Sequence, residues 1–184
     1  MDRSTLEIET PRLLLRPTRR EDFDAFAAFQ ADAESMRYLG SAAQPRSLAW
    51  RSFLTMAGAW AVQGYAMFSV IEKASGRWVG RVGPWQPEGW PGTEVGWGIV
   101  RDRCRLGYAT EAATAAIDWA FAELGWTEVI HVIDLDNVPS QGVARKLGAR
   151  NRGRGRLPAP FADSIIDVWG QTKTEWLARR RSNA

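Results

Sequence analysis

The alternation of apolar and polar positions predicts a chain that begins with one strand and two helices. Residues 13–17, LLLRP, are typical of a strand that ends at a proline. Residues 21–32 and 47–63 repeat apolar side chains at helical spacing, which predicts two amphipathic helices. The stripe expected to be buried on the second helix is Trp50, Phe53, Leu54, Ala57 and Ala61.

The period then changes from helical to that of strands. Residues 65–73, 77–85 and 93–100 predict three strands. Ser75 and Gly76 form a hairpin turn between the first two, and residues 87–92, PEGWPG, form the turn before the third. The middle of the chain is therefore expected to form an antiparallel meander.

The second half of the chain returns to alternating helices and strands. Residues 108–124 predict a helix with many alanines on one stripe, which would let it lie close to a sheet. Residues 128–135 are largely apolar, as in a buried parallel strand. Asn137 and Pro139 then suit the start of a short helix ending at Gly148.

The remaining segments complete a single predicted domain over residues 1–184. A basic loop is expected at residues 149–156, ARNRGRGR, followed by a strand at residues 164–171 and a short terminal helix or tail. The order predicts one mixed α/β domain, in which the meander leads into a β-α-β-α unit.

Composition narrows the class of protein. Hydrophobic residues make up 45% and charged residues 24% of the 184, which is typical of a soluble globular protein. A net charge of +3 is a mild hint of anionic partners. The single Cys104 excludes an internal disulfide, and the single His131 argues against a histidine-rich metal centre. No run approaches the roughly 20 apolar residues of a membrane span, so we expect a cytoplasmic protein.

A basic loop connects the third meander strand to the alanine-rich helix. Arg101, Arg103 and Arg105 precede a helix start near Tyr108. Unpaired N–H groups and a partial positive charge at that start suit a pyrophosphate, although a plain solvated turn would have the same composition. The loop fits neither the GxxxxGK[ST] pattern nor GxGxxG after a strand.

Residues 94–112, EVGWGIVRDRCRLGYATEA, resemble the acyl-coenzyme A loop of the GNAT superfamily of N-acetyltransferases. The most similar branch is the ribosomal-protein-alanine acetyltransferase (RimJ/RimL-like) type. Residues 10–26 and 136–149 resemble two further motifs of that branch, in the same order along the chain. The matching positions are Glu94, Gly96, Trp97, Gly107, Tyr108, Ala109, Glu111, Ala112, Asn137, Ser140, Lys146, Leu147 and Gly148.

Two positions in the loop depart from the family pattern. Cys104 replaces the usual Gln or Arg, and Arg105 stands where the branch usually has glycine. A positive φ at Arg105 would cost roughly 1 kcal/mol relative to glycine. We therefore expect an ordinary backbone there, with the side chain turned to the phosphates or to solvent.

The resemblance implies a fold and a cosubstrate. The fold is a mixed, mostly antiparallel sheet of about seven strands flanked by helices. Its fourth and fifth strands, here residues 93–100 and 128–135, splay apart to hold the pantetheine of acetyl-CoA, and no metal is implied. The implied contacts are backbone groups of Ile99, Val100 and Arg101, and a pyrophosphate cradle of Arg105, Leu106, Gly107, Tyr108, Ala109 and Thr110.

The resemblance also suggests catalytic roles. Glu94 is the first candidate for a general base acting through water, the alternative being a structural carboxylate. Ser140 is the candidate acid for the leaving thiolate, the alternative being a hydroxyl bonded to the backbone. Asn137 could bind the pantetheine or cap its helix, while Lys146, like Arg145, could contact phosphates or face solvent.

Other residues are given more limited roles. His131 is expected to be a core histidine rather than a base. A nucleophilic role for Cys104 is disfavoured, because no histidine is close in sequence and the family transfers the acyl group directly. Trp85 and Trp90 flank a turn and could line an acceptor pocket, with the basic loop beside it.

The leading hypothesis is an acetyl-CoA-dependent N-acetyltransferase acting on a primary amine of a protein N-terminus or a small molecule. The second is a non-catalytic acyl-CoA-binding or sensing domain. The third is an RNA- or ribosome-binding module, whose affinity would fall steeply with salt. A homodimer is compatible with the family, whereas a membrane is not an expected partner and nucleic acid is a weak candidate.

Overall fold

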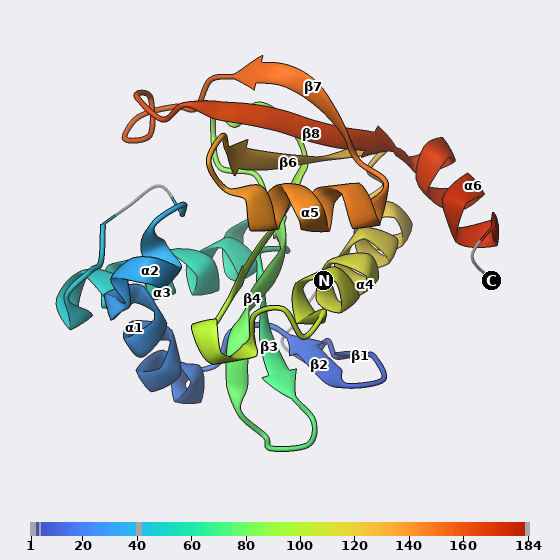
Figure 1. The fold of residues 1–184 in the computed structure, drawn as a ribbon. Helices are drawn as coiled ribbons and strands as arrows, with labels where there is room; N and C mark the ends of the chain where they lie inside the picture. The colour runs from blue at the N-terminus through green and yellow to red at the C-terminus, as the bar shows by residue number, and fades with distance from the viewer. Residues whose placement is uncertain (1–2, 4, 40–41, 183–184) are drawn as a thin grey trace.

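The computed structural model describes residue 3, residues 5–39 and residues 42–182. These residues contain one open sheet with the strand order β1-β2-β3-β4-β5-β6-β8-β7, in which only β5 and β6 are parallel (Figure 1). The predicted mixed, mostly antiparallel sheet is therefore confirmed, with eight strands. The strands are β1 (Ile8–Glu9), β2 (Leu13–Arg16), β3 (Phe68–Glu72), β4 (Trp78–Trp85), β5 (Glu94–Ile99), β6 (Glu128–Asp134), β7 (Arg150–Gly155) and β8 (Ile166–Thr172).

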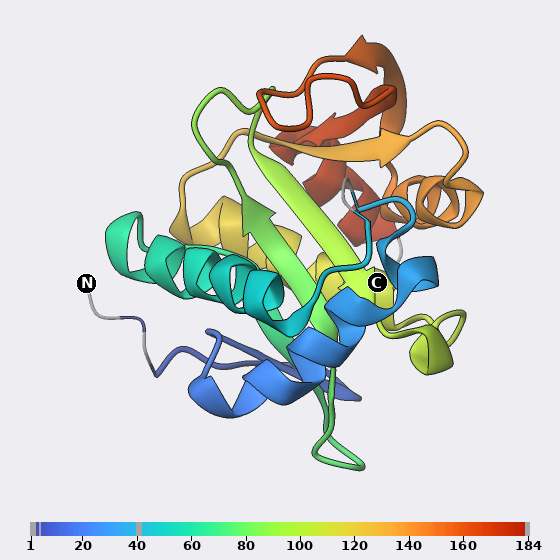
Figure 2. The ribbon, with the colours of Figure 1, turned by 90° about the vertical axis from the view of Figure 1, so that its left-hand side faces the viewer.

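Helices cover both faces of the sheet, with α1 and α3 on one face and α4 on the other (Figure 2). Two 3-10 turns, η1 (Arg20–Asp22) and η2 (Arg101–Arg103), precede α1 and α4. In the described part of the chain, no helix has the length and apolar character needed to cross a membrane. The helices are α1 (Phe23–Ala31), α2 (Ala33–Met36), α3 (Arg46–Val62), α4 (Tyr108–Glu123), α5 (Val138–Leu147) and α6 (Lys173–Ser182).

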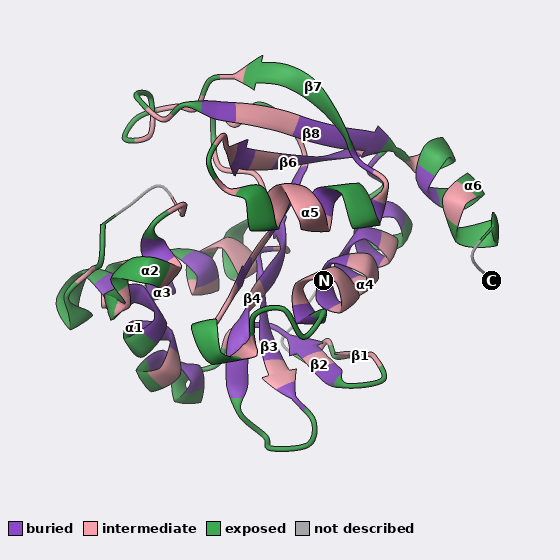
Figure 3. Ribbon diagram, in the orientation of Figure 1, coloured by how far each residue is buried: buried purple, intermediate pink, exposed green. Residues whose placement is uncertain are grey.

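Each layer of helices encloses its own apolar core (Figure 3). Fully buried alanines of α4, including Ala112, Ala116 and Ala120, let that helix approach the sheet closely. On the opposite face, Phe26 and Phe53 meet edge to face with ring centroids 5.4 Å apart. Each fully buried aromatic side chain contributes about 1.5–3 kcal/mol, so the two layers hold the sheet from both sides.

The buried stripe of α3 differs from the prediction. Ala49, Phe53 and Met56 are buried, whereas Leu54 is 48% exposed. Of the predicted stripe, only Phe53 is fully buried, and the true stripe is rotated by about one residue. The rotation brings Trp60 against the sheet, where its indole N–H donates to the backbone carbonyl that precedes β3, at 3.2 Å.

The basic stretch at residues 149–156 forms strand β7, so its prediction as a loop was wrong. β7 pairs antiparallel with β8, with a register shift between Asn151 and Arg154. Arg152 also pairs with Glu128 of β6 at 2.7 Å. The strand is mostly exposed and lacks alternating apolar residues, so the pattern carried no strand signal. Charged side chains on such an edge strand oppose pairing with other chains.

The predicted splay lies between β5 and β6. The parallel contact consists of one register pair, Glu94 with Ile130, whereas β6 and β8 share a register from Glu128 to Asp134. Beyond Glu94, no strand of the described chain pairs with β5 on its β6 side. The separation begins near the middle of the sheet.

A buried carboxylate fixes the loop between β5 and α4 to the meander. Glu72 at the end of β3 accepts hydrogen bonds from the Tyr108 hydroxyl at 2.7 Å and from Arg103 Nε at 3.0 Å. The hydrogen bonds from Ser75, Tyr108 and Arg103 lower the pKa of Glu72 to about 2, against the opposing effect of burial. The first helical residue and the preceding 3-10 turn are therefore held by one side chain.

A second connection joins the N-terminal hairpin to the same loop. Arg12 pairs with Glu111 at 2.6 Å and donates from Nη1 to the Leu106 carbonyl at 2.9 Å. Its guanidinium also stacks over the Tyr108 ring, 4.7 Å from the centroid. The Thr10 hydroxyl donates to Glu111 at 2.6 Å. Two motifs that are distant in the sequence thus form one structural unit.

The low pKa of Glu72 leads to a stability prediction with a definite sign. A carboxyl whose pKa is lower in the folded protein stabilises the fold above its unfolded value of 4.5, and this contribution disappears as the pH falls through about 2. We expect Glu72→Gln to lower Tm clearly at pH 7, with a difference that shrinks as the pH falls from 4.5 to 2. Thermal denaturation across that range tests this.

Glu123→Gln is the matched control, because this exposed carboxylate on α4 makes no ion pair within the described chain. The control should show almost no change in Tm at any pH. A Glu72→Gln difference in Tm that stays constant down to pH 2 would show that the carboxylate charge does not stabilise the loop.

Candidate active site

The splay opens onto a cavity of about 190 Å³ in the middle of the sheet. Side chains and backbone from β4, β5, β6, the start of α5 and the residues after α2 line it. The structure therefore brings together Glu94 and Ser140, which the sequence assigns to different catalytic roles. The lining residues used below are Arg81, Trp85, Trp90, Glu94, Trp97, His131, Asn137, Ser140 and Phe161.

Glu94 is a buried carboxyl at the point where β5 and β6 separate. Its Oε1 accepts the Val132 backbone N–H at 3.1 Å, and its Oε2 accepts the Trp90 indole N–H at 2.5 Å. Burial raises its pKa to about 7, although both hydrogen bonds and the charge of Arg81 act in the opposite direction. A carboxyl that titrates near neutral pH can accept and release a proton under working conditions.

His131 is a packed core histidine in the wall of the cavity. Its Nδ1 lies 2.7 Å from the Val95 carbonyl oxygen, which can only accept, so Nδ1 carries the proton. The ring is 1% exposed and packs 4.8 Å from the Trp97 ring. Burial lowers the pKa of His131 to about 4, which makes it a weak base at neutral pH.

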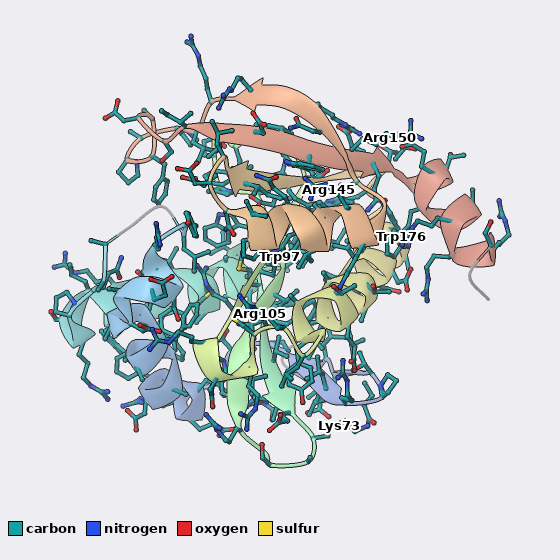
Figure 4. The ribbon with its side chains drawn as sticks, in the orientation of Figure 1. Lys73, Trp97, Arg105, Arg145, Arg150 and Trp176 are labelled. Carbon is teal, nitrogen blue, oxygen red and sulfur yellow. The ribbon has the colours of Figure 1, made fainter. Side chains whose placement is uncertain are left out.

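Ser140 lies at the start of α5 and contacts Trp97, which Figure 4 labels beneath that helix. The Trp97 indole N–H donates to Ser140 Oγ at 3.2 Å, and the serine hydroxyl makes no hydrogen bond to the backbone among the described residues. Because Oγ accepts from the indole, its own proton is free to be donated. Asn137 Oδ1 accepts the Ser140 backbone N–H at 3.2 Å, so the predicted capping role of Asn137 is confirmed.

The backbone of β5 presents polar groups to the splay in an alternating pattern. Val100 N–H donates to the Val79 carbonyl of β4 at 2.9 Å, and antiparallel pairing then directs Gly98 and Gly96 to β4 as well. The N–H and C=O groups of Trp97 and Ile99 consequently point away from β4, towards the gap. Among the backbone groups that the resemblance implies, the Ile99 N–H is available to a ligand. The Val100 N–H is not, because it already donates to the Val79 carbonyl.

The loop before α4 has unpaired amide groups. The N–H groups of residues 105–110 donate no hydrogen bond within the described chain. The first amide of this region that does so is that of Glu111, which donates to the Gly107 carbonyl at 3.0 Å. Gly107 has φ 85° and Arg105 has φ 65°. The expectation of an ordinary backbone at Arg105 was therefore wrong. Arg105 adopts the left-handed conformation because hydrogen bonds on both sides of it hold the loop.

The three arginines of this loop have different environments. Arg103 is held by Glu72 and Asp102, so its role is structural. Arg101 and Arg105 are exposed and make no ion pair in the described segments. The Cys104 thiol lies 3.5 Å from the Val100 carbonyl oxygen, and burial raises its pKa, which keeps it protonated and unsuited to nucleophilic attack.

The two basic side chains of α5 also have different environments. Lys146 shares a surface groove with Gly107 and Thr110 at the start of α4, so it lies on the side of the pyrophosphate candidates. Arg145 instead stacks on Trp169, 5.2 Å from its ring centroid. The groove also extends along α4 to Glu123 and takes in Arg180, so contact between Lys146 and a ligand held by the loop stays a prediction.

The aromatic residues proposed for an acceptor pocket, Trp85 and Trp90, both line the cavity. Phe161, from the segment after β7, meets Trp90 edge to face at 6.3 Å. The sequence did not reveal the contribution of Arg81, although an arginine within the apolar strand RWVGRVGPW was a signal that could have done so. Tyr38, which follows α2, carried no such signal.

The donor set fits the polar parts of acetyl-CoA. Unpaired amides of residues 105–110 and the exposed β5 edge can bind a pyrophosphate and an amide-containing arm. Among the residues with described positions, no group of three or more His, Cys, Asp or Glu side chains could hold a metal ion.

Known proteins are similar to this chain in sequence and in fold. Residues 12–150 match the acetyltransferase (GNAT) domain family. The uncharacterized N-acetyltransferase YnaD of Bacillus subtilis is 26% identical over 148 residues, which cover 80% of this chain and 85% of that protein. The uncharacterized N-acetyltransferase p20 of Bacillus licheniformis is 26% identical over 162 residues, covering 87% and 91% of the two chains.

Solved structures agree with the sequence relatives. An acetyltransferase from Agrobacterium tumefaciens superposes with a TM-score of 0.78 at 27% identity, covering 91% of this chain and 95% of the other. A putative ribosomal-protein-serine acetyltransferase from Vibrio cholerae shares the fold, with a TM-score of 0.73 at 23% identity over 92% and 98% of the chains. The chain therefore belongs to the GNAT family of acetyltransferases and is an acyltransferase.

Proposed function

We propose that this protein transfers an acetyl group from acetyl-CoA directly to a primary amine, as a member of the ribosomal-protein-alanine acetyltransferase (RimJ/RimL-like) branch. The observation that carries the proposal is the meeting of Glu94 and Ser140 in one cavity, at the foot of a splay whose β5 edge offers unpaired backbone groups. Together these provide a base, an acid and a binding edge.

Coenzyme binding uses the loop and the strand edge. The amides of residues 105–110 and the side chains of Arg105 and Lys146 bind the pyrophosphate, and the partial positive charge at the start of α4 adds to them. The outward N–H and C=O groups of Trp97 and Ile99 pair with the pantetheine arm. One of these N–H groups also polarises the thioester carbonyl as negative charge develops on its oxygen.

Glu94 activates the amine. An amine arrives as an ammonium and must lose a proton before its nitrogen can attack the thioester carbon. Glu94 takes this proton through a water in the cavity, because its oxygens are already engaged with Trp90 and Val132. Its pKa of about 7 leaves it partly ionised at neutral pH, which suits transfer in either direction.

Ser140 completes the transfer. As the C–N bond forms and the C–S bond breaks, the sulfur leaves as a thiolate and gains the proton of the Ser140 hydroxyl. The indole N–H of Trp97, 3.2 Å from Oγ, stabilises the resulting negative charge on that oxygen. The second amine proton returns through water to restore the serine, so the products are an amide and free coenzyme A.

The direct test of this proposal is a screen of amines with acetyl-CoA, in which free thiol is measured and acetylated product is confirmed by mass. We expect turnover with at least one class of amine. Binding of acetyl-CoA without turnover of any amine would support a sensing domain instead. Affinity for RNA that is indifferent to coenzyme A would support the third hypothesis.

Glu94→Gln should lower kcat/KM by roughly 100-fold or more, as removal of a general base does. The wild-type rate should rise with pH through about 7, the pKa of Glu94, and this limb should vanish in the variant. Steady-state rates from pH 5.5 to 9 test both points.

Thermal denaturation separates chemistry from folding in this variant. A carboxyl whose pKa is raised by burial destabilises the fold above its unfolded pKa, so Gln at this position should not lower Tm at pH 8. The exposed Glu88→Gln should keep the wild-type profile. An unchanged rate and pH profile in Glu94→Gln would place the base elsewhere.

Ser140→Ala should lower kcat by roughly tenfold or more while the Kd of acetyl-CoA changes little. The physical reason is that the hydroxyl proton acts on the departing sulfur and not on the bound thioester. Ser164→Ala is the control, because Ser164 lines the same cavity but makes no contact with Trp97. Equal kcat in both variants would remove the acid role.

Arg105 can be tested with two substitutions that separate backbone strain from charge. Arg105→Gly should raise the free energy of unfolding by about 1 kcal/mol, because glycine adopts φ 65° without strain. Arg105→Ala keeps the strained conformation and should not stabilise. Both should weaken acetyl-CoA binding roughly fivefold by loss of a solvent-exposed charge contact.

Calorimetric titration of acetyl-CoA and denaturant unfolding provide the two measurements for Arg105. Wild-type affinity in both variants would mean that the guanidinium faces solvent in the complex. No gain in stability for Arg105→Gly would mean that the left-handed backbone is absent in solution.

A further inference from the structure

Arg81 of β4 is a half-buried cation in the cavity wall that makes no ion pair within the described chain. Its Nη1 contacts only thioether sulfurs, Met67 Sδ at 3.4 Å and Met56 Sδ at 4.0 Å. Its Nε is buried without any hydrogen-bond partner. A thioether is a weak acceptor, and enclosing a charged group without a strong partner is unfavourable. The fold thus leaves several guanidinium donors unused.

The carboxylates that line the cavity form no ion pair with Arg81 in the described chain, although Glu94 and Arg81 favour each other's charged form at longer range. Both oxygens of Glu94 are held by Trp90 and Val132, and Asp134 Oδ1 accepts the Asp136 backbone N–H at 2.9 Å. Arg81 makes no ion pair within the described chain. Burial lowers the pKa of Arg81 to about 10, which still leaves it charged at neutral pH. A carboxylate of a ligand in the cavity would supply the ion pair that the described chain does not provide.

Arg81 and Glu94 stand at opposite ends of one sheet face. Arg81 is opposite Gly98 in the β4–β5 register, and Glu94 is four residues away on β5, or about 13 Å along the strand. The two side chains extend into the space between, where Gly96 adds no side chain. A Cβ on Gly96 would lie 2.7 Å from Met67 Cε and 3.4 Å from Glu94 Oε1. The glycine therefore leaves room for the Met67 side chain, which lies beside Glu94 and contacts Arg81.

Resting on the proposed transfer to an amine, we propose that the acceptor is a small α-amino acid or close analogue whose carboxylate binds Arg81. The guanidinium fork matches a carboxylate with two parallel hydrogen bonds. The amine then points to Glu94, and an apolar side group packs against Trp85, Trp90 and Phe161.

The size of the cavity favours such a molecule over a protein. Its volume of about 190 Å³ is below the roughly 300–1,000 Å³ of pockets for drug-sized ligands. A protein N-terminus also lacks the feature that Arg81 selects, because the carboxyl group of its first residue is part of a peptide bond. The charge of Arg81 thus distinguishes a free amino acid from a polypeptide end.

The test compares matched acceptors that differ only in charge. L-phenylalanine and L-leucine are compared with phenylalaninamide, leucinamide and a dipeptide, measuring thiol release with acetyl-CoA. The wild-type protein should prefer the free acids by roughly tenfold or more in kcat/KM. Arg81→Met should bring that ratio close to one, mainly through KM, and Arg81→Lys should retain part of it. Arg51→Met, at an exposed site on α3, should keep the wild-type ratio.

Equal or better turnover of the amides by wild type would overturn the inference, as would an unchanged ratio in Arg81→Met. Thermal denaturation checks the fold of Arg81→Met, which loses the sulfur contacts and the long-range attraction to Glu94 together with the charge. Calorimetric binding of N-acetyl-L-phenylalanine against its amide gives a readout independent of turnover. Absence of thiol release with every amine would contradict the proposed acetyl transfer, whereas carboxylate-selective binding in that case would still support the role of Arg81.

Discussion

The single register pair between β5 and β6 is the constraint on which the site depends. Continuous pairing from Glu94 onward would use the outward backbone groups of Trp97 and Ile99 inside the sheet. Because the strands separate instead, these groups stay available. The space between the strands becomes a cavity lined by β4, β5, β6, the start of α5 and the segment before β8. The same separation leaves Glu94 at its edge, buried enough to raise its pKa and still beside the open space.

An open strand edge inside a protein is unfavourable unless its surroundings are fixed. In this protein, the contacts that hold the open edge of β5 and the following loop in place lie outside the splay. Glu72 holds Tyr108 and Arg103 from the meander, and Arg12 holds Leu106 and Glu111 from the N-terminal hairpin. These contacts keep the amides of residues 105–110 oriented outward without intramolecular partners. They also hold Arg105 in a conformation that arginine alone would avoid.

The sequence predicted the elements whose side chains alternate strongly between core and solvent. Such patterns are present in the aromatic face of α1, the alanine stripe of α4 and the apolar β6. The splay was predicted from the resemblance to the family motifs. β7 lacked a pattern because an exposed edge strand is stabilised by backbone pairing and by the ion pair of Arg152, neither of which depends on apolar spacing. The buried face of α3 differs from the predicted one because Trp60 packs against the sheet and donates a hydrogen bond to the backbone carbonyl that precedes β3.

Site residues were predictable where a motif names them and not where the environment creates their chemistry. Glu94 and Ser140 came from the family motifs that the sequence resembles. The left-handed backbone of Arg105 arises from contacts with other segments, which residue preference alone does not reveal. Arg81 became significant only when its neighbours proved to be sulfur atoms rather than carboxylates.

The central claim is that coenzyme binding uses the open edge of β5 and the unpaired amides before α4. The most direct measurement is a titration with acetyl-CoA that follows backbone amide resonances. The account predicts the largest shifts at Trp97, Ile99 and residues 105–110, with smaller shifts at Gly96 and Gly98, whose amides are directed to β4. Shifts that spare the splay, or that are equal for both sets of β5 amides, would contradict it.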